Sequence, residues 1–117
     1  MTTTDIVVEL SRIGRELDDL SREIARLDAA CVQAWHSHRL EYARTFLSSK
    51  GEGTQEDRKQ AAILAVEEYK LAAEGADQAL RAAQERIRVL RNRLEIGRSL
   101  GAARRSEFAA EATGQHT

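Results

Sequence analysis

The sequence contains no proline, a single cysteine and few aromatic residues, which make up 4% of its 117 positions. Sheet-built domains need β-branched and aromatic residues separated by Pro/Gly turns, so this shortage argues against a β-sandwich or a doubly wound sheet. One cysteine can form neither an intramolecular disulfide nor a zinc site built on cysteine pairs. No stretch approaches 18 uncharged apolar residues, so we expect no membrane-spanning helix.

Motifs for targeting and catalysis are also missing. The N-terminal segment MTTTDIVVELSR lacks a basic region followed by an apolar run, so no signal peptide is predicted. The Gly-Glu-Gly segment at 51–53 has no following GK[ST], and no nucleophile elbow supports a Ser/His/Asp arrangement. His36 and His38 are two residues apart and point to different sides of a helix, which does not suit zinc. We therefore predict no enzyme, and no catalytic residue, cofactor, metal or small-molecule substrate.

What the sequence does contain is typical of long, solvated helices: 32% charged residues, with apolar residues that are mostly Ala, Leu, Ile and Val. Apolar residues of the first half recur in alternating steps of four and three, the heptad pattern of a coiled coil. This first seam comprises Ile6, Leu10, Ile13, Leu17, Leu20, Ile24, Leu27 and Cys31. The second half has a seam of its own, rich in alanine. It comprises Ala62, Val66, Tyr69, Ala73, Ala76, Leu80, Ala83, Ile87, Leu90, Leu94, Gly97 and Gly101.

The segment SSKGEGT at 48–54 is the one convincing break, because it combines two Gly and two Ser with a loss of apolar period. Thr54 and Asp57 after it resemble a capping box, and Thr4 is a good N-cap for the first helix. The predicted boundaries are a disordered start at 1–3, a helix at 4–48, a loop at 49–54, a helix at 55–112 and a disordered tail at 113–117.

These elements predict an all-α fold, in which residues 4–112 form one domain, an antiparallel two-helix hairpin or long coiled coil. Such a hairpin buries only one seam, and this chain has no disulfide or metal to stabilise it, so we expect a homo-oligomer. Several apolar residues lie off the seam and support this expectation. They are Val7, Val8, Ile63, Leu64, Leu71, Val89, Ile96 and Leu100.

A fold-back centred on Lys50 predicts which residues face each other. The expected seam pairs are Leu10–Leu90, Ile13–Ile87, Ile6–Leu94, Leu27–Ala73 and Cys31–Tyr69. The same register brings together flanking residues of opposite charge, and one aromatic with one aliphatic. The expected flank pairs are Glu9–Arg93, Glu16–Arg86, Asp28–Lys70 and Trp35–Ile63. Each exposed ion pair contributes only about 0–1 kcal/mol, so we expect these pairs to help set the register and to add little to the stability of the fold.

Residues 86–105 hold seven arginines and a single acid, Glu95. The register uses two of these arginines as partners for glutamates and assigns no acid to Arg88, Arg91, Arg98, Arg104 and Arg105. Arg91, Arg98 and Arg105 are one heptad apart and form a stripe, of which Arg98 and Arg105 are expected to pass the start of the first helix. Such a stripe can track a sugar-phosphate backbone or pair with acids of a neighbouring subunit, and both interpretations remain open.

The aromatic residues also allow two interpretations. Trp35, Tyr42 and Phe46 share one side of the first helix, and Tyr69 is expected close to Cys31. They predict a hydrophobic cluster beneath the fold-back or, alternatively, a surface on which bases stack.

The segment EYARTFLSSKGEGTQEDRKQ at 41–60 carries a resemblance to a known family. A helix bearing Tyr42 runs into a short Gly/acid loop and returns as a long Ala-rich helix that ends in a basic stretch. This layout resembles the UvsY-type recombination mediators of tailed phages and the small phage proteins grouped with them. The resemblance implies a helical, ring-like homo-oligomer that binds single-stranded DNA and helps a RecA-like recombinase to load, in the cytoplasm of a bacterial host cell. It implies DNA contacts by Arg88, Arg91, Arg98, Arg104 and Arg105.

Two functional hypotheses follow. The first is a non-enzymatic, oligomeric, single-stranded-DNA-binding recombination mediator of phage type, with no membrane partner. The alternative is a coiled-coil adaptor or inhibitor that docks a helix face on another protein without binding nucleic acid.

Overall fold

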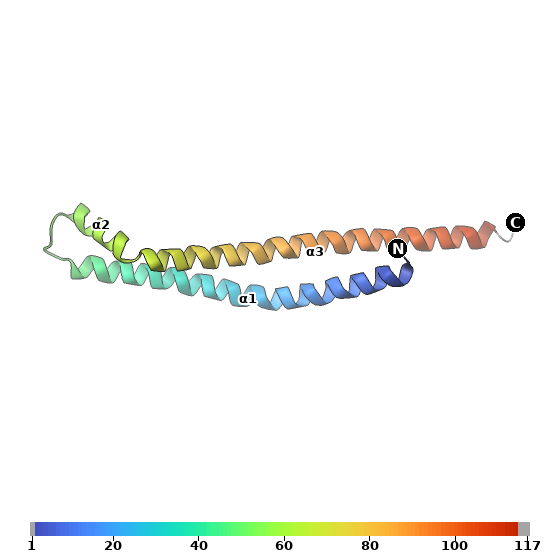
Figure 1. The fold of residues 1–117 in the computed structure, drawn as a ribbon, viewed down its shortest axis with the longest axis horizontal. Helices are drawn as coiled ribbons and strands as arrows, with labels where there is room; N and C mark the ends of the chain where they lie inside the picture. The colour runs from blue at the N-terminus through green and yellow to red at the C-terminus, as the bar shows by residue number, and fades with distance from the viewer. Residues whose placement is uncertain (1, 115–117) are drawn as a thin grey trace. The chain divides into compact units, whose positions relative to one another are not determined.

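The computed structural model describes residues 2–114, and within this range the chain forms helices and no strand. The expected all-α class is confirmed. The helices are α1 (Thr3–Ser48), α2 (Gln55–Ala65) and α3 (Glu67–Gly114), labelled in Figure 1. The tail expected at 113–117 begins inside α3, and residue 1 and residues 115–117 lie outside the described range.

The chain divides into two compact units, although we expected one domain over 4–112. Among the described residues, the first unit contains 2–22 and 84–114, and the second contains 23–83. Both α1 and α3 therefore contribute to each unit. The first unit consists of the beginning of α1 and the later part of α3, and the second contains the fold-back.

The start of α1 is fixed by a reciprocal pair of hydrogen bonds. The backbone N–H of Asp5 donates to the Thr2 hydroxyl at 3.1 Å, and the Thr2 N–H donates to the Asp5 carboxylate at 3.0 Å. These bonds satisfy donors that a helix N-terminus leaves unpaired, and they lower the pKa of Asp5. Thr4, expected as the N-cap, lies inside the helix instead, because α1 begins one residue earlier.

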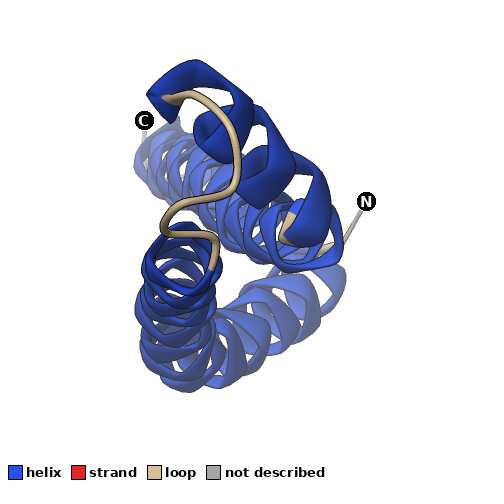
Figure 2. Ribbon diagram, turned by 90° about the vertical axis from the view of Figure 1, so that its left-hand side faces the viewer, coloured by secondary structure: helices blue, strands red, loops and turns tan. Residues whose placement is uncertain are grey.

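The loop between α1 and α2, tan in Figure 2, occupies the predicted position at 49–54. Gly51 and Gly53 have φ of 85° and 84°, a backbone region that favours glycine. The Thr54–Asp57 capping box is confirmed, with each side chain accepting a hydrogen bond from the other residue's backbone N–H at 3.1 Å. Figure 2 shows how this loop brings the chain back from α1 into α2.

Arg58 ties α2 to the end of α1 within the second unit. Its guanidinium donates to the Phe46 carbonyl at 2.6 Å and to the Ser49 hydroxyl at 3.3 Å. The same group lies 4.2 Å from the centre of the Phe46 ring, in cation–π contact. One arginine therefore satisfies a carbonyl at the C-terminal end of α1 and covers its last aromatic ring.

The helix expected over 55–112 is interrupted at Val66. This residue has φ −107° and ψ 12°, outside the helical range, although its N–H still donates to the Ala62 carbonyl at 3.2 Å. Val66 and Ala62 are both buried in the core of the second unit. α2 consequently meets α3 at an angle (Figure 1). No proline or glycine marks the position, which explains why the sequence pattern did not indicate it.

Packing in the first unit follows the predicted seams but in a different register. Ile6, Ile13 and Leu90 are buried, each at a predicted seam position. A Cβ built on Gly97 would lie 2.5 Å from Leu10 Cδ2, and one built on Gly101 would lie 4.0 Å from Ile6 Cγ2. These contacts replace the expected Leu10–Leu90 and Ile6–Leu94 pairs, so α3 is displaced by one heptad. A one-heptad shift keeps both seams face to face, which is why the apolar pattern allows either register.

Packing in the second unit also departs from the expected pairs. Cys31 is buried and its thiol is hydrogen-bonded to Asp77, whereas Tyr69, its expected partner, is 42% exposed. The Trp35 indole N–H donates to the same Asp77 carboxylate at 3.1 Å. Lys70, expected to pair with Asp28, instead lies 3.9 Å from Glu74 in an exposed pair along α3.

Candidate nucleic-acid interface

The arginine stripe, defined as Arg91, Arg98 and Arg105, lies along one flank of α3 in the first unit. A heptad step corresponds to nearly two helical turns and about 10.5 Å of rise, so the three guanidinium groups follow one line. All three side chains are exposed. Within the described chain, no ion pair or hydrogen bond engages any of these three groups. The stripe therefore presents three solvated cations that the first unit does not neutralise.

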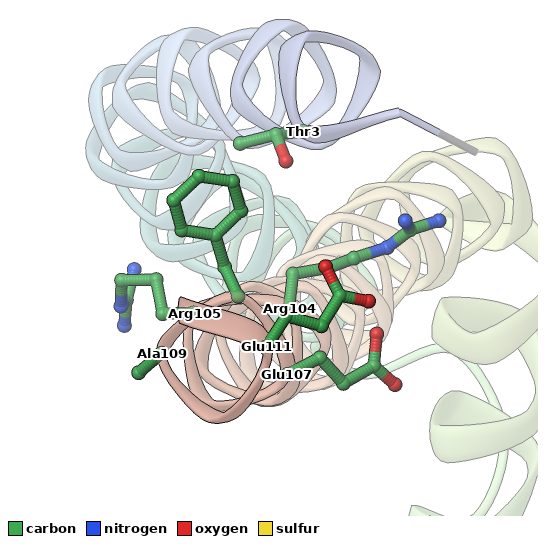
Figure 3. Close-up of a pocket in the computed structure, with 7 residues that line it drawn as sticks. Thr3, Arg104, Arg105, Glu107, Ala109 and Glu111 are labelled. Atoms are coloured by element: carbon green, nitrogen blue, oxygen red, sulfur yellow. The ribbon is translucent and has the colours of Figure 1, made fainter. Parts of the chain in front are cut away.

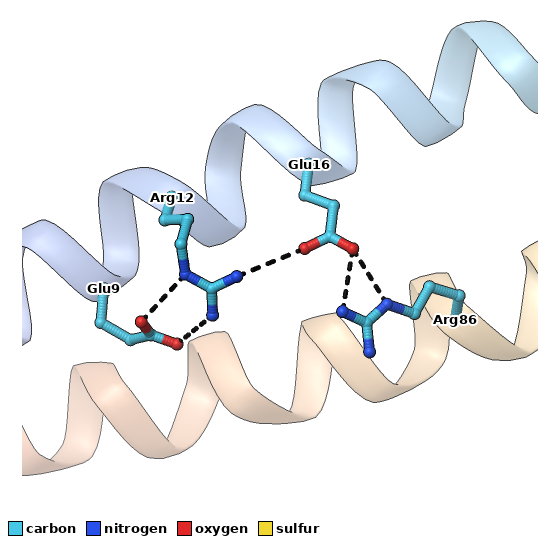
Figure 4. A network of polar contacts seen from close by, with 4 residues as sticks. All are labelled: Glu9, Arg12, Glu16 and Arg86. Atoms are coloured by element: carbon cyan, nitrogen blue, oxygen red, sulfur yellow. Dashed lines mark hydrogen bonds and ion pairs between the residues drawn. The ribbon is translucent and has the colours of Figure 1, made fainter.

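Arg86 has a different role, because it forms the cross-helix ion pair that the sequence predicts. Its Nη2 lies 2.9 Å from Glu16 Oε1, and its Nε donates to the same oxygen at 3.0 Å. Arg12 bridges Glu16 and Glu9 on the same flank, as Figure 4 shows. The expected Glu9–Arg93 pair is replaced by Glu9–Arg12. The hydrogen bond from Arg12 is the main cause of a lowered pKa at Glu9, and the charge of Arg93 contributes to a smaller degree.

Arg88 has an acidic partner that the sequence analysis did not assign. It forms a bidentate pair with Glu85, one turn earlier on α3. The hydrogen bond and the charge of Glu85 raise the pKa of Arg88, and Arg88 in turn lowers the pKa of Glu85. Because this pair is already formed, Arg88 is a weaker candidate for phosphate binding than the stripe.

Arg104 and Arg105 are adjacent in sequence but point to opposite sides of α3 (Figure 3). The carboxylates of Glu107 and Glu111 lie on the side of Arg104. The side of Arg105 therefore carries the positive charge, whereas Arg104 shares its side with two acids. Arg104 also takes part in an interaction of its own, so it is not counted with the stripe.

Two hollows lie between the beginning of α1 and the stripe. The first, of about 210 Å³, has an apolar floor and two arginines of the stripe at its edge. It is lined by Thr3, Ile6, Val7, Leu10, Gly97, Arg98, Gly101 and Arg105. The second, of about 450 Å³, adjoins it through Thr3 and Arg105. It is lined by Thr3, Arg104, Arg105, Glu107, Phe108, Ala109 and Glu111, and Figure 3 shows it from close by. Contrary to expectation, Arg98 and Arg105 thus lie beside the start of α1.

Phe108 is the residue that the sequence analysis missed. It continues the second seam, since Gly101, Arg104 and Phe108 keep the alternating steps of three and four. It follows Arg105 by three residues, which places the two side chains on neighbouring parts of one helix face. Its side chain is 75% exposed. The heptad pattern of the second seam therefore marks position 108 in the sequence itself.

The other aromatic residues lie in the second unit, where Trp35, Tyr42 and Phe46 make ring contacts. The Tyr42 and Phe46 rings are stacked with centres 6.4 Å apart, and Trp35 meets His38 edge-on at 5.7 Å. The hydrogen bond to Asp77 also holds the Trp35 indole in place. Because these rings are engaged with one another and with Arg58, their geometry favours the hydrophobic cluster over a base-stacking surface.

The described residues contain no candidate metal site and no candidate membrane span. Within residues 2–114, no cluster of three His, Cys, Asp or Glu side chains has a geometry that holds a metal ion. No helix in that range combines the length and apolar character that crossing a membrane requires. Comparisons of the chain with protein-family models, with curated proteins and with solved structures found no significant match.

Proposed function

We propose that the chain is a non-enzymatic protein that binds single-stranded DNA, with the arginine stripe as its contact to the phosphates. The observation that carries this proposal is the solvated state of Arg91, Arg98 and Arg105, which have no partner within residues 2–114. Regularly spaced arginines release the counterions of a nucleic-acid backbone, so binding is tolerant of sequence and sensitive to salt. The wider role as a phage-type mediator that loads a RecA-like recombinase rests on the resemblance of the loop and helix order.

The proposal includes self-assembly, because the apolar residues off the seam remain exposed. Seven of the eight such residues named from the sequence are exposed by 46–72%. Val89 is the exception and is half-buried. A homo-oligomer that covers these side chains would repeat the stripe and so multiply the phosphate contacts.

A second candidate function is favoured by the opposite flank of the same unit. There, Ile96 and Leu100 line an apolar hollow of about 180 Å³ together with Leu10 and Ile13. Arg98 and Leu100 are two residues apart and therefore about 200° apart around α3, so the two flanks are chemically distinct. The apolar flank suits a helix of another protein and supports the adaptor as the alternative.

The experiment that separates these functions is a titration of the whole chain against a fluorescein-labelled oligothymidylate, followed by anisotropy from about 50 to 300 mM salt. The proposal expects binding at low salt that weakens steeply as the salt concentration rises. The triple variant Arg91→Glu, Arg98→Glu, Arg105→Glu should abolish binding and leave the helical circular dichroism unchanged.

A matched control changes the net charge by the same amount elsewhere. Arg15→Glu, Arg39→Glu, Arg81→Glu replaces three other exposed arginines and should keep most of the affinity. Equal losses in both triple variants would show that only the net charge matters, and would overturn the stripe as the site. If the wild-type chain does not bind at low salt, the adaptor becomes the leading function, and capture of a partner through the Ile96/Leu100 flank is tested next.

A further inference from the structure

The two hollows beside the arginine stripe form a continuous path along α3. They share Thr3 and Arg105, and the path runs from Arg98 past Arg105 to Phe108. The first hollow has an apolar floor, made by Ile6 and other residues of the two seams. Its lining residues, all within the described chain, include no acidic side chain. The path therefore combines positively charged and apolar side chains, so it can contact both the phosphates and the apolar faces of a ligand.

Phe108 lies at the far end of this path and is unusually exposed. Its exposed fraction, 75%, is the highest among the large exposed hydrophobic residues of the described chain. α3 continues beyond the beginning of α1 at this end (Figure 1), and Thr3 is the α1 residue that lines the same hollow as Phe108. An aromatic ring in this state gains contact area when a flat partner covers it.

We propose that Phe108 is a stacking platform for a base of single-stranded nucleic acid whose phosphates are bound by Arg98 and Arg105. This inference deepens the proposed function and rests on it, because it names the residue that distinguishes single strands from duplex. Stacking is tolerant of sequence, since every base has a π-face, but a duplex keeps its bases inside the helix. The arginines alone would bind either form through phosphates.

The charges around Phe108 favour a nucleotide over a second copy of this chain. Arg105 points away from the side on which Glu107 and Glu111 lie (Figure 3). Glu107 and Glu111 line the same hollow as Phe108, so phosphates that follow the stripe from Arg98 would reach Phe108 from the Arg105 side. A second α3 packed on Phe108 would instead have to cover Arg105, a solvated cation, and that arrangement is an outcome that the test below detects.

The test compares substitutions at position 108 in the whole chain, with an oligothymidylate and a fully paired hairpin of equal length as probes. Phe108→Ala should weaken oligothymidylate binding by about 5-fold to about 150-fold and leave the dependence on salt unchanged. Binding of the paired hairpin should not change. Phe108→Trp should retain the affinity, and its emission should be quenched by the oligothymidylate beyond any change that Trp35 shows in the wild-type chain.

Phe108→Leu is the matched control, because it keeps the apolar character without the π-face. If Phe108→Leu binds as tightly as the wild-type chain, or if Phe108→Ala loses no affinity, the stacking platform is overturned. A lower molar mass of Phe108→Ala in light scattering would overturn it as well and assign the ring to contact with a second copy. Absence of wild-type binding overturns both proposals, whereas binding that depends on Arg98 and Arg105 but not on Phe108 overturns this one alone.

Discussion

Leu10 occupies the space that any side chain at position 97 would need, since a Cβ built on Gly97 would lie 2.5 Å from Leu10 Cδ2. At the same point Gly97 lowers the intrinsic stability of α3 by about 1 kcal/mol relative to alanine. Gly97 therefore lowers the stability of α3 as an isolated helix but allows α1 and α3 to approach closely in the first unit.

The first prediction compares this glycine with one that has open space around it. Gly14→Ala should raise the free energy of unfolding by about 0.5–1 kcal/mol, because nothing lies within 4 Å of the added Cβ. Gly97→Ala should raise it by less, since the Leu10 methyl must move. Gly97→Leu should lower it by about 1–3 kcal/mol through overpacking. Urea unfolding followed by circular dichroism measures all three, and equal gains for the two alanine variants would contradict the close contact.

The second prediction concerns the cross-helix pair of Glu16 and Arg86. A double-mutant cycle with alanine at both positions should give a coupling free energy of about 0.2–1 kcal/mol, because the two side chains remain 32% and 41% exposed. The coupling should shrink as salt is added. The control cycle uses Asp19 and Arg22, whose side chains are 73% and 74% exposed, and it should give less. A Glu16–Arg86 coupling no larger than this control would argue against the ion pair.

The third prediction follows from the capping box at the start of α2. Hydrogen bonds from the Thr54 backbone N–H and then from its side chain lower the pKa of Asp57 below 3.8. Its ionised carboxylate therefore stabilises the fold fully above pH 3.8, and this contribution is lost as the pH falls through the lowered pKa. The difference in the free energy of unfolding between the wild-type chain and Asp57→Asn should therefore be largest above pH 3.8 and should shrink as the pH falls through the lowered pKa.

Carbon-detected NMR titration of the Asp57 carboxyl group provides the direct measurement for this third prediction. In Thr54→Ala the pKa should rise part of the way, because the backbone N–H at position 54 remains. An Asp57 that titrates at 3.8 or above in the wild-type chain would refute the capping geometry.

The fourth prediction uses Cys31 and Trp35 as reporters of Asp77. Burial, followed by the hydrogen bond to Asp77, raises the pKa of the Cys31 thiol above 9.0, so the wild-type thiol should react slowly with Ellman's reagent. Asp77→Ala should increase the rate and shift the emission of Trp35, the one tryptophan, because the indole loses its acceptor. Asp28→Ala, which removes the smallest cause of the shift, is the control and should change the rate less. An unchanged Trp35 spectrum in Asp77→Ala would contradict the hydrogen bond.

Most of the core was predictable from the sequence, because burial in a coiled coil follows the heptad. All of the buried apolar residues of the described chain occupy predicted seam positions. They are Ile6, Ile13, Cys31, Ala62, Val66, Ala73, Ala83 and Leu90. The Thr54–Asp57 capping box was predictable for a similar reason, since it depends on residues three positions apart.

The register and the break at Val66 were not predictable in the same way. A shift by one heptad keeps seam residues against seam residues, and Arg86 is long enough to reach Glu16 in the register that the structure adopts. The fold-back itself depends on the positive φ of Gly51 and Gly53 and on Val66, whose backbone lies outside the helical range. Of the five arginines to which the sequence assigns no acid, the three of the stripe have no partner within residues 2–114, whereas Arg88 pairs with Glu85, one turn earlier on the same helix.

The contact of Arg58 with Phe46 has a consequence for the order in which the chain folds. These residues are twelve positions apart, so closing the loop between them costs little chain entropy. The contacts of Leu10 with Gly97 join residues more than eighty positions apart, and closing that loop directly costs more. We therefore expect folding to begin at the fold-back and to proceed toward the termini, so that the basic end of α3 acquires its partner helix last.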